Sequence, residues 1–164
     1  MINLQPITWQ NYEAIIALKV HDHQKEFVDS NERCLVKAYI DWRQHGVRSF
    51  EYGIYDGDTP IGFVMIEYRS AQRSLLEDNI PSYIIWEFMI DKHHQGKGLG
   101  RAAMEAIVAK LKTNPETNGE GDAQQIVVLY EPANMVVAKL YAALGFEDKG
   151  KRSSDGDIYV QLVY

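Results

Sequence analysis

The chain has 164 residues, of which 46% are apolar, a formal net charge of −6 and one cysteine, Cys34. The length and composition predict a single globular domain, residues 1–164, and the acidic charge disfavours nucleic acid as a partner and favours cationic small molecules. One cysteine cannot form an intrachain disulfide, so we expect a reducing, cytoplasmic environment and inert packing of Cys34. The sequence shows no signal-peptide pattern and no apolar run near the ~20 residues of a membrane span, so no membrane partner is expected.

The N-terminal half predicts a strand, two helices and a β-hairpin. Asp29 or Ser30 caps the second helix and Gly46 ends it, and apolar residues with helical spacing lie between them, with Cys34 on the same side. Those apolar positions are Leu35, Ala38, Tyr39 and Trp42. We expect, in chain order, a strand at 2–7, a helix at 9–20 capped by Thr8, the helix after Ser30, and a hairpin of 49–55 and 61–68.

The C-terminal half predicts alternating strands and helices. Residues 69–82 form a polar connection with a helical turn at Leu75 and Leu76, and the nearly all-apolar strand 83–90 is typical of a position buried on both faces. A helix follows with a buried stripe of Leu99, Ala103, Ile107 and Leu111. We then expect a loop at 113–123, a strand at 125–130, a helix at 135–144 between the cap Asn134 and the stop Gly145, and a hairpin of 146–151 and 157–164.

The segment between the strand 83–90 and the following helix is rich in glycine. Gly96, Gly98 and Gly100 are expected to adopt positive φ and to let the backbone approach a ligand. Free N–H groups at a helix N-terminus form an anion site, so the loop predicts a phosphate ligand. The spacing fits neither the nucleotide P-loop nor the dinucleotide fingerprint.

Two motifs make the residue pattern more specific than the glycines alone. The run Q-G-K-G-L-G at 95–100 fits Q/R-x-x-G-x-G/A, and E-P-A-N at 131–134 precedes a helix that carries Tyr141 and ends in Gly-Phe. In this order the motifs resemble those of the GNAT superfamily of N-acetyltransferases. The resemblance implies an α/β fold with a central, mostly antiparallel mixed sheet and helices on both faces. It also implies acetyl-CoA as co-substrate, lying between the strand that ends at Ile90 and the strand that ends at Tyr130.

The same resemblance assigns the acetyl-CoA contacts. The loop residues would hold the pyrophosphate, the backbone of Met89 and Ile90 would pair with the pantetheine amides, and Asn134 would hold the pantetheine arm or a water. Arg101 would reach a phosphate, although a solvated helix-face arginine is an equal alternative. The predicted loop contacts are Gln95, Gly96, Lys97, Gly98, Leu99 and Gly100.

A narrower resemblance points to the spermine/spermidine acetyltransferase group. It rests on Q-x-x-F-V from Gln24 to Val28, W-x-F-M-I-D from Trp86 to Asp91, and Q-G-K-G-x-G. The implied acceptor is a polyamine, and the group's habits suggest a homodimer. Glu26, Asp29 and Glu32 near the second helix are candidate substrate-binding carboxylates, with a solvated acidic helix face as the alternative.

Acetyl transfer to an amine needs a base for the ammonium and an acid for the leaving thiolate. Glu87, the only acid within the strand 83–90, is the candidate base, and the alternative is a structural pair with a basic neighbour. Tyr141 is the candidate acid, and the alternative is a core aromatic residue. No activated Cys or Ser nucleophile is evident, so the amine is expected to attack the thioester directly in a ternary complex.

Other functions remain open from the sequence. The acceptor amine could belong to a protein or an antibiotic, and the domain could be a non-catalytic acyl-CoA sensor. His93 and His94 are adjacent on a turn and lack the spacing of a helical metal pair, so no metal is expected.

Overall fold

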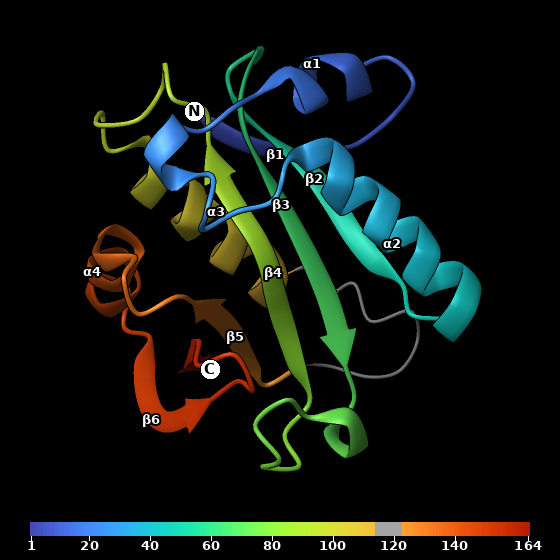
Figure 1. Ribbon diagram of the computed structural model, residues 1–164, viewed down its shortest axis with the longest axis vertical. Coiled ribbons are helices and arrows are strands. Elements are labelled where there is room, and N and C mark those ends of the chain that lie inside the picture. The colour runs from blue at the N-terminus through green and yellow to red at the C-terminus, as the bar shows by residue number, and fades with distance from the viewer. Residues whose placement is uncertain (114–122) are drawn as a thin grey trace. The chain divides into compact units, whose positions relative to one another are not determined.

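The computed structural model describes residues 1–113 and 123–164 (Figure 1). The described chain forms two compact units, Met1–Glu67 with Glu87–Ala109, and Tyr68–Trp86 with Lys110–Tyr164. Most of the predicted loop at 113–123 lies outside the described residues. The expectation of a single domain stays a prediction, and the two units are described in turn.

The described elements follow the predicted order of strands and helices. In chain order they are β1 (Ile2–Pro6), α1 (Tyr12–Ala17), α2 (Asn31–His45), β2 (Ser49–Asp56), β3 (Thr59–Arg69), β4 (Ser82–Ile90), α3 (Leu99–Thr113), β5 (Gln125–Tyr130), α4 (Met135–Ala143), β6 (Glu147–Arg152) and β7 (Ile158–Val163). Short 3₁₀ turns occur at Asp22–Gln24 and Ala71–Arg73. Within the described ranges, no helix has the length and apolar character needed to cross a bilayer.

In the first unit the strands are ordered β1-β2-β3-β4, and different helices cover the two sheet faces. A Cβ built on Gly53 would lie 2.5 Å from Ile15 of α1. The neighbouring residue in β2, Ile54, shares the opposite face with Ile90, and a Cβ built on Gly100 of α3 would lie 3.7 Å from Ile90. Figure 1 shows α3 passing behind the strands. Helices therefore cover both faces of this unit, as predicted.

In the second unit the strands are ordered β4-β5-β7-β6. The ladder of β4 and β5 is parallel and joins Ser82–Ile85 to Gln125–Val128, whereas β5–β7 and β6–β7 are antiparallel. An apolar cluster of Leu76, Ile84 and Val127 is buried on one face of this sheet. The two units thus contribute to a mixed α/β architecture, which confirms the predicted fold class.

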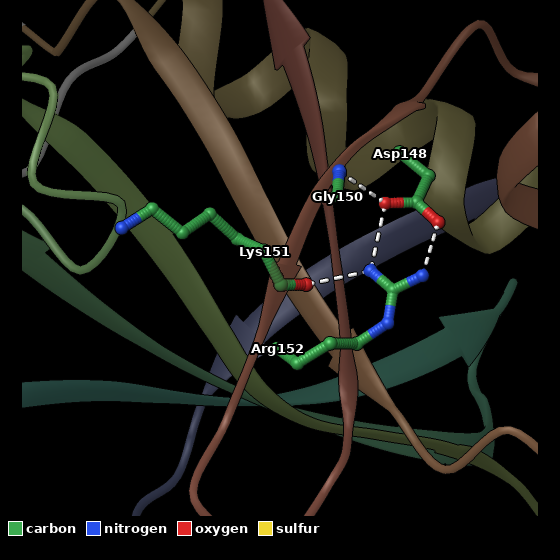
Figure 2. Close-up of polar contacts among 4 residues, drawn as sticks. All are labelled: Asp148, Gly150, Lys151 and Arg152. Carbon is green, nitrogen blue, oxygen red and sulfur yellow. Dashed lines mark hydrogen bonds and ion pairs between the residues drawn. The ribbon is translucent and has the colours of Figure 1, made fainter.

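The strand β6 contains a bulge that organises its own side chains. Gly150 has φ +84°, and the register of β6 with β7 shifts between Asp148 and Arg152. Figure 2 shows the Asp148 carboxylate accepting the Gly150 N–H at 2.7 Å and two guanidinium N–H groups of Arg152 at 2.8 and 2.9 Å. The bidentate pair of Asp148 and Arg152 and the positive φ of Gly150 therefore stabilise the bulge.

One local prediction was wrong and a second was correct in part. The first helix begins at Tyr12 and not at Trp9, because the side chain of Asn11 accepts the Thr8 N–H at 2.7 Å and turns the chain before the helix begins. Leu75 and Leu76 form a single hydrogen-bonded turn, in which the Glu77 N–H donates to the Ser74 carbonyl at 3.3 Å. A 3₁₀ turn that was not predicted lies earlier, at Ala71–Arg73, and Leu76 is 7% exposed and packs in the apolar cluster.

The helix α2 begins and ends as predicted, but its apolar side is only partly buried. The Ser30 hydroxyl accepts the Arg33 N–H at 3.3 Å, and Gly46 takes the left-handed conformation with φ +68°. Cys34 is 1% exposed, whereas Tyr39 is 59% and Trp42 is 45% exposed. A cavity of about 360 Å³ is lined by Leu35, Ala38, Tyr39, Trp42, Arg48, Ser49 and Glu51.

Candidate active site

The loop between β4 and α3 is anchored by Asp91, which follows β4 directly. Its carboxylate is buried and accepts the backbone N–H of Lys19 at 2.8 Å and that of His93 at 3.0 Å. Burial alone would raise the pKa of Asp91, but these two hydrogen bonds hold the pKa below its usual value. Asp91 therefore stays ionised and ties the start of the loop to the end of α1.

Gln95 closes the same loop. Its side-chain N–H donates to the carbonyl of Ile90 at 2.8 Å and to the side-chain carbonyl of Gln24 at 2.9 Å, and its own carbonyl accepts from Gln24 at 3.1 Å. The Gln95 side chain thus positions the loop, and its predicted contact with the co-substrate stays a prediction. Gln24 belongs to the Q-x-x-F-V pattern, and this contact explains why a glutamine stands there.

The glycines of the loop differ in their roles. Gly96 and Gly98 adopt φ +73° and +77°, and a Cβ built on either would contact nothing within 4 Å. Gly100 lies in α3 and has no positive φ, so the prediction for this residue was wrong. It lies after the start of the helix, where ordinary helical dihedrals apply. Its small size instead lets α3 pack against Ile90.

The backbone amides of the loop form a donor cradle. The Ala102 N–H donates to the Gly98 carbonyl at 3.2 Å, which is the first backbone bond of α3. The N–H groups of Leu99, Gly100 and Arg101, in the first turn of α3, precede that bond and have no acceptor within the helix. Such a row of amides at the positive end of a helix is suited to bind an anion.

Two basic side chains border this cradle. The Lys97 ammonium donates to the His93 carbonyl at 2.8 Å, and the Arg101 guanidinium pairs with Glu105 at 3.0 Å, one helical turn away. Both are largely exposed, so they are free to exchange these contacts for a ligand in water. Their predicted phosphate contacts, and that of the half-buried Leu99 backbone, stay predictions.

The end of β4 is held from both sides. A Cβ built on Gly62 would lie 2.4 Å from the Met89 carbonyl, so only glycine allows β3 to approach here. The buried amide of Asn31 donates to the Ile15 carbonyl at 2.8 Å and contacts the Met89 sulfur at 3.8 Å. Sequence reasoning missed Asn31 because the first residue of a helix is ordinarily solvated.

Glu87 is half-buried beneath the N-terminal part of α2. Burial, with a smaller contribution from the nearby Asp29 carboxylate, raises its pKa to about 7, whereas the Lys37 ammonium acts in the opposite direction. The backbone of Asp29 and the side chain of Cys34 also act to lower this pKa. A carboxyl group with a pKa near neutrality is suited to accept a proton at physiological pH. Cys34 is buried, and burial raises the pKa of its thiol to about 12, as expected of a packing residue.

The three predicted substrate carboxylates have different surroundings. Glu26 and Glu32 are exposed. Asp29 is 29% exposed and forms ion pairs with Lys37 and Arg33, the latter at 3.3 Å. The structure therefore brings Asp29 to Glu87 and leaves the other two at the surface, and their contacts with a substrate stay predictions.

In the second unit the motif around α4 is formed as predicted. The side-chain carbonyl of Asn134 accepts the Val137 N–H at 3.4 Å, so Asn134 caps the helix. Tyr141 is 3% exposed, and its ring lies 5.9 Å from that of Tyr130 and 5.6 Å from that of Phe146. Tyr141 therefore packs as a core aromatic residue, and this packing is compatible with a catalytic role for its hydroxyl.

No cluster of three metal-ligating side chains occurs among residues 1–113 and 123–164. His21 and His23 stack on each other with ring centroids 5.7 Å apart.

Comparison with known proteins gives a consistent family. The acetyltransferase (GNAT) family matches residues 17–146 of the chain. The chain is 29% identical over 162 residues to a probable spermine N(1)-acetyltransferase of Bacillus subtilis subsp. natto (strain BEST195), with 95% of this chain and 94% of that protein covered. It is 28% identical, with the same coverage, to the spermine/spermidine N(1)-acetyltransferase of Bacillus subtilis (strain 168).

Solved structures share the fold. The aminoglycoside acetyltransferase AAC(6')-Ib in complex with coenzyme A and kanamycin has a TM-score of 0.74 at 20% identity, covering 99% of this chain and 95% of its own. The spermidine N-acetyltransferase from Vibrio cholerae in complex with CoA and spermine has a TM-score of 0.70 at 14% identity, with the same coverage.

Proposed function

The chain belongs to the acetyltransferase (GNAT) family, and we propose that its acceptor is a primary amine of a polyamine such as spermidine or spermine. As a member of that family it is an acetyl-CoA-dependent N-acetyltransferase. The observation that carries the substrate proposal is the similarity to two enzymes named for spermine over 95% of this chain. The aminoglycoside enzyme is 20% identical and supports the fold alone.

Two side chains are proposed to transfer protons in the reaction, one from the ammonium of the acceptor and one to the leaving thiolate. An alkylammonium with a pKa of about 10.4 must lose a proton before it attacks, and Glu87 is the group proposed to accept it. The neutral amine attacks the thioester carbonyl directly and forms the C–N bond, the C–S bond breaks, and the Tyr141 hydroxyl protonates the leaving thiolate. The nitrogen then gives up its second proton, which restores the Tyr141 hydroxyl. The proton taken by Glu87 passes to solvent, so that a neutral amide and free CoA remain.

The amide cradle of residues 96–101 is proposed to bind the pyrophosphate of acetyl-CoA. Gly98→Ala places a Cβ on a residue with φ +77°, which costs roughly 1–2 kcal/mol and is expected to weaken CoA binding about 5- to 30-fold. Gly46→Ala is the matched control, since Gly46 has φ +68° at the end of α2 and a Cβ there would contact nothing within 4 Å. It introduces the same backbone strain outside the loop, so little change in CoA affinity is expected. Calorimetric titration of the folded variants with CoA measures both, and equal affinities for the pair would reject this loop as the pyrophosphate site.

The proposed substrate class can be tested by comparing amines of different charge at low and high ionic strength. Each additional ammonium that pairs with an exposed carboxylate contributes ~0.2–1 kcal/mol, so kcat/KM is expected to rise about 1.5- to 5-fold from a monoamine to a diamine and again to spermidine. High ionic strength should reduce this preference because it screens exposed pairs. The measurement compares spermine, spermidine, a diamine, an aminoglycoside and a lysine peptide at low and high salt. A higher kcat/KM for the peptide or the aminoglycoside would show that the polyamine is not the preferred acceptor. Absence of turnover with any amine would favour a non-catalytic acyl-CoA sensor.

We also propose a cytoplasmic location and a homodimer. The single buried thiol suits a reducing compartment. Sedimentation at several concentrations tests the assembly, since a dimer has twice the 18.8 kDa of one chain.

A further inference from the structure

We propose that the exposed side of α2 is the interface with a second copy of this chain, and that the two α2 helices pack antiparallel about a two-fold axis. The inference rests on the proposed homodimer, and it adds the surface and the orientation through which the two chains meet. It does not depend on the acetyl-transfer chemistry.

Among the described residues, α2 exposes more large apolar side chains than any other helix or strand. Val36, Tyr39, Ile40 and Trp42 are between 43% and 59% exposed, and only two of the 15 residues of α2 are buried. Figure 1 shows α2 at the outside of the first unit. Neighbouring apolar side chains of this size at the surface are typical of an interaction site.

Four exposed side chains form a straight stripe along α2. Glu32, Val36, Tyr39 and Arg43 follow one another at spacings of four, three and four residues, which places them on one side of the helix. The stripe has a carboxylate at its N-terminal end, two apolar side chains at its centre and a guanidinium at its C-terminal end. At 1.5 Å per residue it spans roughly 16 Å. The ring of Trp42 lies 6.2 Å from that of Tyr39 and widens the apolar centre.

The charged ends of this stripe are not paired within the chain. In the part of the chain that the structure describes, neither Glu32 nor Arg43 has an ion-pair partner, whereas Arg33 and Lys37 of the same helix both pair with Asp29. The two end charges are therefore available to a partner. For Glu32 such a pair is the alternative to the substrate contact predicted from the sequence.

The stripe is complementary to itself when its direction is reversed. Glu32 and Arg43 are equidistant from the middle of the stripe, and so are Val36 and Tyr39. A two-fold axis through the middle, perpendicular to α2, brings Glu32 to the partner's Arg43 and Val36 to the partner's Tyr39, and each contact occurs twice. Parallel helices would instead bring like charges together at both ends. This match of charge and apolar surface favours a second copy over a different protein as the occupant.

Charge reversal tests the antiparallel pairing. Glu32→Arg turns both end contacts into pairs of arginines, and Arg43→Glu turns both into pairs of glutamates. Each single variant should raise the Kd of the dimer about 5- to 500-fold, because two repulsions replace two ion pairs. The double variant has opposite charges at both ends again, so its Kd should return to within about fivefold of wild type. Sedimentation at several concentrations measures each Kd, and the differences should shrink in high salt.

An equimolar mixture of the two single variants is the sharpest measurement. One chain then carries two arginines and the other two glutamates at the ends of the stripe, so the mixed dimer should be about 5- to 500-fold tighter than the dimer of either variant alone. Misfolding of either variant could not produce this result.

Asp41→Arg is the matched control for Glu32→Arg. It makes the same change in charge at another exposed residue of α2. Asp41 lies nine residues, or two and a half turns, after Glu32 and therefore on the other side of the helix. The Kd of this variant should stay within about twofold of wild type, as expected for a charge outside the interface.

The outcomes separate the interface from the dimer itself. A wild-type chain that stays at 18.8 kDa at every concentration would overturn the inference together with the proposed homodimer. A dimer with the same Kd in wild type and both single variants, or a mixture no tighter than the single variants, would overturn the α2 interface and keep the homodimer. The acetyl-transfer proposal is tested separately, by turnover of amines.

Discussion

Glu87→Gln is expected to lower kcat by about 10²- to 10⁴-fold, the range for removal of a general base. Glutamine keeps the size and the hydrogen-bonding shape of the side chain but cannot accept the ammonium proton. The wild-type enzyme should show a rate that rises through about pH 7, where Glu87 ionises, and the variant should lose this acid limb. Steady-state kinetics with spermidine between pH 5 and 9, in steps of about half a unit, measure both effects.

The Glu87→Gln substitution should also change the pH dependence of the free energy of unfolding. The pKa of Glu87 in the folded protein is about 7, above the ordinary value of 4.5, so folding favours the protonated carboxyl. That contribution is fully present below pH 4.5 and is lost as the pH rises through 7. A glutamine side chain at this position does not titrate, so the variant should gain stability relative to wild type above pH 7 and should lose activity there. A residue that loses activity but gains stability on replacement is one retained for chemistry.

Glu51→Gln is the control for this experiment. Glu51 is also half-buried on the face of the sheet toward α2, but it already accepts a hydrogen bond from Ser49 and lies on β2. Its replacement should leave kcat within a few-fold of wild type and keep the acid limb. If the Glu87→Gln variant is as active as wild type and keeps the acid limb of the pH–rate profile, Glu87 has a structural role and is not the base.

The loop shows how far a motif predicts geometry. The order of glycines predicted an anion site after β4, and the positive φ of Gly96 and Gly98 and the N–H groups of the first turn of α3 fit that prediction. The sequence did not distinguish Gly100, which is helical, because the start of α3 depends on which carbonyl accepts the Ala102 N–H. Helix ends are decided by such single hydrogen bonds, and the pattern of residues seldom determines them.

Residues that hold the loop from outside could not be found from spacing. Asp91 bonds to the backbone of Lys19, and Gln95 bonds to Gln24, across 72 and 71 positions of the chain. Sequence periodicity and motifs describe a single helix, strand or loop. These contacts instead depend on how the chain after α1 and the 3₁₀ turn pack against the end of β4. One signal was present for Asp91, since a polar side chain directly after a buried strand has to find partners.

The surroundings of Glu87 show the same limit. A lone acid within an apolar strand indicated a functional or paired carboxylate, and its half-burial fits that reading. Which groups act on it depends on the turn that places Asp29 before α2, and both Asp29 and Ser30 were possible caps. The structure uses Ser30 as the cap, and this leaves the Asp29 carboxylate free to meet Lys37.

Tyr141→Phe is expected to lower kcat by about 10²- to 10⁴-fold if its hydroxyl protonates the leaving thiolate. The ring contacts with Tyr130 and Phe146, which bury the side chain, do not involve the oxygen atom and should survive. Folding and CoA affinity should therefore change little, and the loss should fall on kcat. Tyr159→Phe removes the same single oxygen from a half-buried tyrosine of the second unit and is expected to keep kcat within a few-fold of wild type.

The leaving group separates acid catalysis from packing in the Tyr141→Phe variant. A general acid matters most when the departing thiolate is basic, so an acetyl thioester with a more acidic thiol should lose much less rate in the variant than acetyl-CoA does. If Tyr141 only shapes the core, both donors should slow by the same factor, since the thiol's acidity does not affect packing. Near-normal kcat with acetyl-CoA, or equal losses with the two donors, would therefore assign Tyr141 to packing and would require another proton donor for the thiolate.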